Sequence, residues 1–476
     1  MTLSPTDWDA LRRTLSGALV LPGDADYERA RQSALRQYDD IRPQAVAYCA
    51  SPADVAEVLA FGGTHALPTV PRSGGHSYGG YSSTEGLVLD VSRINHIRRE
   101  NGNVVVGAGT QSVDLLRTLD PHGVAVVAGA CPNVAIGGFL QGGGMGWLTR
   151  RYGLGSDRLV AATVVLPDGR AVRASPDEHP DLFWALQGNG GGNFGVVTEY
   201  EVRPVELTSM VMYALSWPYD AAARLLEVWQ PWALGAPVEL GAGITVTDGD
   251  PERPGPQVDV HGSWLGSVED LDALLDALVA EVGVKPLFRG VEHKSFYAAM
   301  METFLCQDLE ADQCYRVGYS PEAALPRENF FQHRNRMFDR TLPAAQIGDL
   351  LDQFASGRPE HQFRLMYVDA FGGVANEPDR TATAYVHRTT QILAGFGVSL
   401  TDENFTGEDV TAAKTWLAGG FGRLDPGSLG ESYQNFIDPD LEDWKTAYYA
   451  ENWERLTQVR EQYDPEGFFR FARAVD

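Results

Sequence analysis

The chain has 476 residues, 44% hydrophobic and 21% charged, which is typical of a soluble globular protein of two or three domains. Its 64 acidic side chains outnumber the 38 basic ones, so the formal net charge is −26. A chain this acidic, without any Lys/Arg-rich run, repels polyanions. We therefore expect neither nucleic-acid binding nor attachment to an anionic membrane surface.

Four cysteines, Cys49, Cys131, Cys306 and Cys314, are spaced in a way that matches no zinc site. They are also too few for a disulfide framework. Cys306 and Cys314 could form a bond, but the sequence favours two reduced thiols. The first residues lack the apolar stretch of a signal peptide, and no apolar run is long enough to cross a membrane. We therefore expect a cytoplasmic protein with no membrane contact.

Short helices and strands alternate along the first 200 residues, as in an α/β or α+β unit. Ser51 and Pro52 provide a helix cap and a first helical residue, and Val55, Val58 and Leu59 follow as an apolar stripe. The sequence predicts helices over residues 6–17 (capped by Thr6 or Asp7 and ended by Gly17), 51–61 and 113–119, and strands over 87–91, 104–106, 124–128, 159–166 and 196–202.

The pattern changes near Pro204, where strands and longer amphipathic helices begin to alternate. No low-complexity linker separates the two parts, so residues 204–208 are expected to form a close-packed junction. The sequence predicts strands over residues 213–217, 257–262 and 364–370, and helices over 265–282, 381–393 and 441–462.

Glycine is concentrated in three segments, residues 71–80, 129–155 and 188–195. Because glycine is costly to order, such runs are retained where the backbone adopts positive φ or approaches a ligand closely. Consecutive backbone N–H groups turned inward form an anion cradle that needs no lysine. The three segments therefore predict a site for a diphosphate, to which Arg72 could add a charge-assisted contact.

One formal motif in these segments has the wrong neighbours. Gly190-x-Gly192-x-x-Gly195 fits the dinucleotide fingerprint, which requires a preceding strand and a following helix. Here a helix-like segment precedes the motif and a strand follows it, so we reject a Rossmann site.

A second motif fits the nucleophile elbow of serine hydrolases. Gly75-x-Ser77-x-Gly79 matches it, and Asp369 and His387 follow in the chain order of a triad. The elbow requires a helix directly after the serine, and the residues YGGYSSTEG cannot form one. A serine hydrolase is therefore only a remote alternative.

The chain resembles the berberine-bridge-enzyme-like flavoproteins of the vanillyl-alcohol-oxidase superfamily at PRSGGHSYGGYSS, GACPNVAIGGFLQGGGMGW, RRYGLGSDRL, DLFWALQGNGGGNFGVVTEYEVRP and SYQNFIDP. The resemblance extends from about residue 43 to the C-terminus and implies an α+β fold. A two-subdomain FAD-binding domain of the PCMH type would span residues 1–206. A substrate domain with an antiparallel sheet covered by helices would span 207–430, and a segment returning to the FAD domain would span 431–476.

The resemblance implies FAD attached at two side chains, His76 to the 8α-methyl carbon and Cys131 to C6 of the isoalloxazine. In this family, a small residue three positions after the cysteine is typical of the oxygen-admitting members. Val134 stands at this position, so the resemblance implies an oxidase. The other cofactor contacts that the resemblance implies, some of them supported by the glycine pattern, are Arg72, Ser73, Gly74, Gly75, Ser77, Gly79, Gly137, Gly138, Gly142, Gly143, Gly146, Val196, Val197 and Asn435.

The family's catalytic position lies in the C-terminal Tyr-x-Asn motif, which makes Tyr433 the candidate general base. Because an unperturbed tyrosine has a pKa near about 10, this role requires a local stabilisation of the phenolate. Asp369 could orient or tune Tyr433. Tyr367 and His387 lie in the same segment as Asp369, and Tyr367 is a further catalytic candidate.

These implications together predict an FAD-dependent oxidase that passes a hydride from a small-molecule alcohol, hemiacetal or sugar, or natural-product intermediate to the flavin, with O2 as acceptor and H2O2 as product. One alternative is oxidative cyclisation or C–C bond formation by the same flavin. Another is a flavoprotein that binds a drug or metabolite without turnover. The sequence identifies no single substrate and leaves a monomer or a homodimer open.

Overall fold

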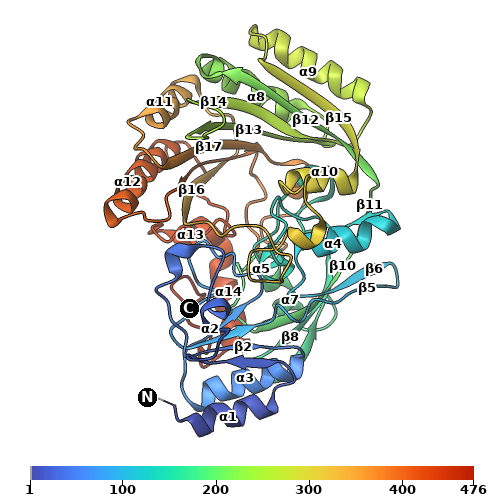
Figure 1. The fold of residues 1–476 in the computed structure, drawn as a ribbon. Coiled ribbons are helices and arrows are strands. Elements are labelled where there is room, and N and C mark those ends of the chain that lie inside the picture. Colours follow the sequence, from blue (N-terminus) through green and yellow to red (C-terminus); the bar gives the residue numbers. More distant parts are fainter. Residues whose placement is uncertain (1–2) are drawn as a thin grey trace.

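The computed structural model describes residues 3–476 and confirms the α+β fold class (Figure 1). Two small sheets form the part of the molecule that contains the N-terminal residues. The first has strand order β1-β2-β4-β3, in which β2, β4 and β3 are parallel and β1 is antiparallel. Its strands are β1 (Ala18–Val20), β2 (Ala45–Tyr48), β3 (Thr69–Arg72) and β4 (Leu87–Asp90).

The second small sheet is antiparallel, with strand order β5-β6-β10-β8-β9. Its strands are β5 (Ile97–Glu100), β6 (Asn103–Gly107), β8 (Leu159–Val165), β9 (Ala171–Ala174) and β10 (Val196–Val202), and a separate two-stranded ladder joins β7 (Val124–Ala125) to β11 (Val205–Glu206). The helices of this part are α1 (Pro5–Thr14), α2 (Tyr27–Ala30), α3 (Pro52–Thr64), α4 (Ser112–Leu119), α5 (Ile136–Gln141), α6 (Thr149–Tyr152) and α7 (Pro180–Leu186).

A seven-stranded antiparallel sheet forms the other end of the molecule, in the order β15-β12-β14-β13-β17-β18-β16. Its strands are β12 (Ser209–Pro218), β13 (Leu240–Asp248), β14 (Gln257–Trp264), β15 (Phe288–Ser295), β16 (Phe330–Phe338), β17 (Gln362–Ala370) and β18 (Ile392–Leu400). Figure 1 shows that the outer face is covered by α8 (Ala222–Gly235), α9 (Val268–Val282), α11 (Ala344–Ala355) and α12 (Gly407–Leu424), while α10 (Phe296–Thr303) lies toward the small sheets.

The covering helices follow from their sequence. Ser267 accepts a hydrogen bond from the Asp270 N–H and caps α9, which ends at Gly283 in the left-handed region. Leu271, Leu275 and Leu278 recur at helical spacing and are fully buried against the sheet. The opposite face of the sheet is left free to form a wall of the site.

The C-terminal residues lie against the small sheets through α13 (Trp444–Tyr449) and α14 (Trp453–Tyr463), drawn in red beside the green and blue elements of Figure 1. Arg460 of α14 donates to the carbonyl of Asn193, and the Val475 N–H donates to Asn193 Oδ1 at 2.9 Å. These contacts join the chain end to the third glycine segment.

Three element predictions need correction. The expected helix over 381–393 is absent, because residues 384–386 are fully buried and the Ala384 and Tyr385 N–H groups bond the backbone of residues 184–187. The expected helix over 441–462 is broken at Ala450, which has φ +41°. The first helix is capped by Ser4 and ends at Thr14.

The prediction of two reduced thiols at Cys306 and Cys314 is also wrong. The chain turns back after α10 and brings their Cα atoms to 6.2 Å, and the two sulfur atoms are joined in a disulfide. Both residues are buried beside Phe304 and Tyr315. Cys49 is buried and free, and Cys131 is exposed and free.

No helix within residues 3–476 is long and apolar enough to cross a membrane. In the same residues, no group of three or more His, Cys, Asp or Glu side chains could hold a metal ion.

Arg150 of α6 holds the large sheet against the small ones. Its guanidinium is buried and donates to the carbonyls of Ala233, Ala236 and Leu240, at the end of α8 and the start of β13. A planar guanidinium reaches three carbonyls at once, and a charged donor also suits the C-terminal end of a helix.

We predict that Arg150→Lys lowers the free energy of unfolding by roughly 2–4 kcal/mol, because a lysine leaves buried carbonyls without donors. Urea unfolding monitored by tryptophan fluorescence measures the change. The neighbouring Arg151 is 44% exposed, so Arg151→Lys is the matched control with little expected effect. Equal stability of the two variants would contradict this role.

Candidate active site

A cavity of about 530 Å³ lies between the glycine segments and the inner face of the large sheet. All three glycine segments reach it, and so do the end of β17 and the C-terminal Tyr-x-Asn motif. The sequence-predicted residues that line it are Arg72, Ser73, Gly74, Gly75, His76, Ser77, Cys131, Val134, Gly137, Gly138, Gly146, Val196, Val197, Asp369, Tyr433 and Asn435. Four other predicted residues, Gly79, Gly142, Gly143 and Tyr367, are not part of the lining.

The first glycine segment leaves β3 at Arg72 and turns at Gly75, where φ is +70°. Arg72 Nε bonds Asp90 Oδ2 at 2.6 Å, and its Nη2 bonds the Ala30 carbonyl at 2.6 Å. This pairing fixes the side chain on the side of the first sheet. Arg72 therefore supports the turn, while backbone N–H groups remain to meet an anion in the cavity.

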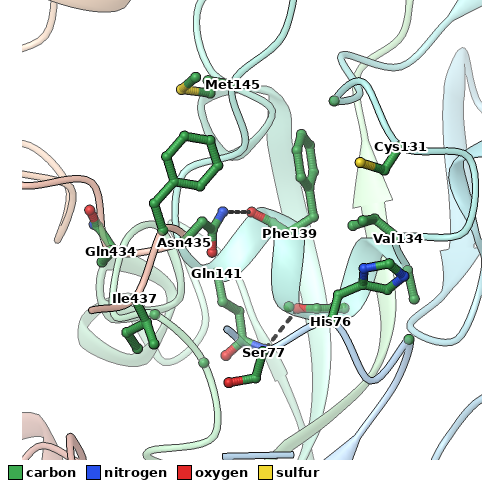
Figure 2. Close-up of a pocket in the computed structure, with 18 of the residues that line it drawn as sticks. His76, Ser77, Cys131, Val134, Phe139, Gln141, Met145, Gln434, Asn435 and Ile437 are labelled. Carbon is green, nitrogen blue, oxygen red and sulfur yellow. Dashed lines mark hydrogen bonds between the residues drawn. The ribbon is translucent and has the colours of Figure 1, made fainter. Parts of the chain in front are cut away.

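His76 and Cys131 lie on the same side of the cavity, with Val134 between them in the view of Figure 2. Burial, together with the positive charge of Arg316, lowers the pKa of His76 to about 4. His76 is therefore neutral near pH 7 and has a free ring-nitrogen lone pair. The surrounding protein raises the pKa of the Cys131 thiol, and the Glu328 carboxylate adds to that rise.

The second and third glycine segments leave room for a long ligand. A Cβ atom on Gly138 would meet nothing within 4 Å, and one on Gly191 would meet nothing closer than 3.7 Å. Gly190, Gly191 and Gly192 all have positive φ, between +72° and +91°. The Gly191 N–H bonds Asn189 Oδ1, which fixes the turn. This cradle fits the diphosphate and ribityl chain of a dinucleotide, so the residues present suit FAD.

The predicted glycines outside the lining pack against protein. A Cβ atom at Gly142 would lie 1.9 Å from Asn435 Oδ1, and one at Gly143 would lie 2.8 Å from the Tyr385 ring. Gly79 is equally close to Ile437 and Tyr81. Gly142 and Gly79 therefore allow the C-terminal motif to approach the cavity, and Gly143 makes room for Tyr385.

The phenol oxygen of Tyr433 is surrounded by donors. It accepts hydrogen bonds from the Gly144 N–H at 3.0 Å, the Met145 N–H at 3.1 Å and Asn435 Nδ2 at 3.0 Å. No acceptor for its own proton occurs in the part of the chain that the structure describes. Burial still raises the pKa of Tyr433 to about 12, although the three donors act in the opposite direction. Asn435 also bonds the Phe139 carbonyl, as Figure 2 shows.

Strand pairing places Asp369 and His261 around one small residue. Gly243 of β13 pairs with Asp369 of β17 on one side and with His261 of β14 on the other. A Cβ atom at Gly243 would lie 2.8 Å from Asp369 Oδ1 and 3.3 Å from His261 Cε1, so only glycine allows this approach. The His261 and Trp147 rings pack edge to face, with their centroids 5.6 Å apart.

Burial raises the pKa of Asp369 to about 7. Its carboxylate lines the cavity, and no described residue donates a hydrogen bond to it. Burial also lowers the pKa of His261. Tyr367 is two residues from Asp369 but is buried beside Phe436 and His333, with its hydroxyl unpartnered. The wall therefore presents one carboxyl group and one neutral imidazole.

The structure contradicts the serine hydrolase alternative. His387 is fully buried, with Nδ1 2.7 Å from Glu431 Oε2 and Nε2 3.0 Å from Gln434 Oε1, so neither ring nitrogen is free for Ser77. Ser77 Oγ accepts a bond from the Tyr81 N–H, and no helix follows it. Gln434 lines the main cavity, which makes this network a support for its wall.

Sequence reasoning missed several lining residues, chiefly Trp147, His261, Phe371 and Phe471. Phe371 directly follows the predicted strand, so its position was accessible from the sequence. His261 and Gly243 carry no local signal, because only the register of three strands brings them to Asp369.

Comparisons with known proteins identify the family of the chain. A family model described as "FAD binding domain" matches residues 43–175, and one described as "Berberine and berberine like" matches 432–476. (R)-6-hydroxynicotine oxidase of Paenarthrobacter nicotinovorans is 36% identical over 477 residues, covering 97% of each chain. Glucooligosaccharide oxidase of Sarocladium strictum is 28% identical, covering 90% of this chain and 86% of that one.

A solved structure of the glucooligosaccharide oxidase from Acremonium strictum, described as having a 6-S-cysteinyl, 8α-N1-histidyl FAD, has a TM-score of 0.88 at 24% identity, covering 99% of each chain. This likeness shows the fold. The sequence relatives show the family as well, because one of them is over 30% identical along nearly the whole length. The chain therefore belongs to the berberine-bridge-enzyme-like family of FAD-linked oxidoreductases, as its sequence motifs predicted.

Proposed function

We propose that this protein is an FAD-dependent oxidase that removes a hydride from the carbinol carbon of an alcohol, hemiacetal or sugar, or natural-product intermediate, with FAD attached at His76 and Cys131. The observation that carries the proposal is the placement of these two side chains on one wall of the glycine-lined cavity (Figure 2). When bound, the flavin would supply the hydride acceptor, and O2 would take up the electrons to give H2O2.

The state of the two side chains supports the double attachment. A neutral His76 has the lone pair that a bond to carbon requires, and its low pKa keeps that form available near neutral pH. Cys131 is free and reaches the same cavity. Val134 lies beside both, where the family resemblance implies access for O2.

Oxidation of an alcohol also requires an acceptor for the hydroxyl proton. Asp369 is the stronger candidate, because its carboxyl reaches the cavity and its pKa of about 7 matches neutral conditions. His261, across Gly243, is placed to bind the same substrate oxygen or its neighbour. Tyr433 remains a candidate, and its three donors would stabilise a phenolate, but burial opposes that charge.

The first prediction concerns the attachment. Acid-precipitated wild-type protein should remain yellow, and His76→Ala and Cys131→Ala should each retain flavin through the remaining residue. The double variant should release all of it, as measured by absorbance of the supernatant. Cys49→Ala is the control, because Cys49 is buried away from the cavity. Flavin retained by the denatured double variant would contradict the assignment.

The second prediction concerns the reaction. Mixing the holoprotein with a panel of sugars, secondary alcohols and alkaloids should identify a substrate that yields one carbonyl group and one H2O2 per turnover. Peroxide assay and product mass spectrometry measure both. A product with a new ring or C–C bond would support oxidative cyclisation instead, and binding without peroxide would support a sequestering protein.

The third prediction separates the two candidate bases. Because the base must be ionised, anaerobic flavin reduction should rise with pH through about 7 and then level off. Asp369→Asn should remove this rise and slow reduction by about 10²–10⁴-fold. Tyr433→Phe should keep the rise. Stopped-flow absorbance measures the rates, and the reverse pattern in the two variants would assign the proton to Tyr433.

A further inference from the structure

A second cavity, of about 560 Å³, lies behind the first glycine segment. Arg72, Ser73, Gly74 and His76 border both cavities, so this segment separates them. The remaining walls come from the first sheet and from residues 316–321, which cross over from the large-sheet part of the chain. Nothing in the proposed oxidation uses this cavity.

Positive charge is concentrated around the second cavity, in a chain whose net charge is −26. Four arginines line it, Arg29, Arg72, Arg93 and Arg316. Among the described residues, its lining carboxylates are Asp26 and Asp90, and both are already paired: Asp26 with Arg29 at 2.6 Å and Asp90 with Arg72 at 2.6 Å.

The other two arginines have no such partner. Within residues 3–476, no carboxylate oxygen lies within 4.0 Å of the guanidinium of Arg93 or Arg316. Arg93 lies over the Tyr48 ring at 4.9 Å. The cavity wall therefore has two more positive than negative charges.

Buried donors without partners border the same cavity. The Arg72 side chain is only 5% exposed, and its Nη1 bonds nothing although Nε and Nη2 are both engaged. Arg316 donates from Nη2 to the Gln32 carbonyl, and its Nη1 is likewise buried and unpartnered. The Ser320 hydroxyl is a third unpartnered group. Leaving such donors unsatisfied is costly.

Water molecules could accept hydrogen bonds from these donors, but they would not neutralise the positive charge. Burial lowers the pKa of Arg316 to about 10, and the like charges of Arg72 and Arg327 contribute to that shift. Guanidinium groups held together in this way repel one another until an anion lies between them. A phosphate accepts several such hydrogen bonds at once, and its oxygens match the fork of a guanidinium in bidentate geometry.

We propose that the second cavity is a binding site for a phosphate group, held by Arg72, Arg316 and Ser320. The group would be free inorganic phosphate or the end of a phosphomonoester, for which the volume beyond one phosphate leaves room. The cradle for the FAD diphosphate faces the main cavity, whereas Arg316 and Ser320 line only the second one, so the two sites lie on opposite sides of the first glycine segment and share Arg72 between them.

Calorimetric titration of the FAD-loaded protein tests this proposal, because bound FAD fills the diphosphate cradle. The titrants are inorganic phosphate and glycerol 3-phosphate, with sodium chloride at equal ionic strength as the control. We expect saturable binding of one phosphate group and a higher melting temperature with phosphate than with chloride. Tighter binding of the phosphomonoester would identify that source, and equal or weaker binding would identify inorganic phosphate.

Arg316→Gln should weaken phosphate binding about tenfold or more, because it removes a charged donor. Arg99→Gln is the matched control, since Arg99 is exposed on β5 and outside the cavity. If Arg316→Gln does not fold, Ser320→Ala and Arg93→Gln provide the same test with severalfold weaker binding. No saturable phosphate binding, or equal affinity in the cavity variants and in Arg99→Gln, would overturn the proposal.

Discussion

The main cavity depends on the close approach of backbone to ligand at three glycine segments that lie far apart in the sequence. Positive φ at Gly75 and at residues 190–192 turns the chain around a space that side chains would otherwise fill. In a strongly acidic protein, backbone N–H groups offer positive potential without lysine. The backbone conformation therefore shapes the cofactor site, and the surrounding side chains need not supply the positive potential.

The second requirement is that ionisable groups near the cavity take useful protonation states. Burial keeps His76 neutral and brings the pKa of Asp369 close to 7. The same desolvation opposes a phenolate at Tyr433, despite its three donors. Burial thus favours the neutral forms of His76 and Tyr433 and places the titration of Asp369 near neutral pH. Arg316 lines the second cavity, and its charge helps to lower the pKa of His76, which borders both cavities.

Much of the fold and of the candidate site could be predicted from the sequence, because the motifs that carry them are short and continuous. The glycine segments, His76, Cys131 and the Tyr-x-Asn motif stand in continuous stretches, and caps such as Ser51 are readable one residue at a time. The errors fall where distant contacts override local pattern. Residues 381–393 have an amphipathic pattern that resembles a helix, yet Ala384 and Tyr385 within them bond the backbone beside α7 instead. Gly243 and His261 reach the site only through strand register, and the Cys306–Cys314 bond depends on a turn after α10.

Proteolysis of the denatured holoprotein followed by mass spectrometry tests the double attachment of the flavin. We expect one flavin-bearing species in which the peptide containing His76 and the peptide containing Cys131 are joined through a single FAD. Recovery of both peptides unmodified, with the flavin free in solution, would contradict it.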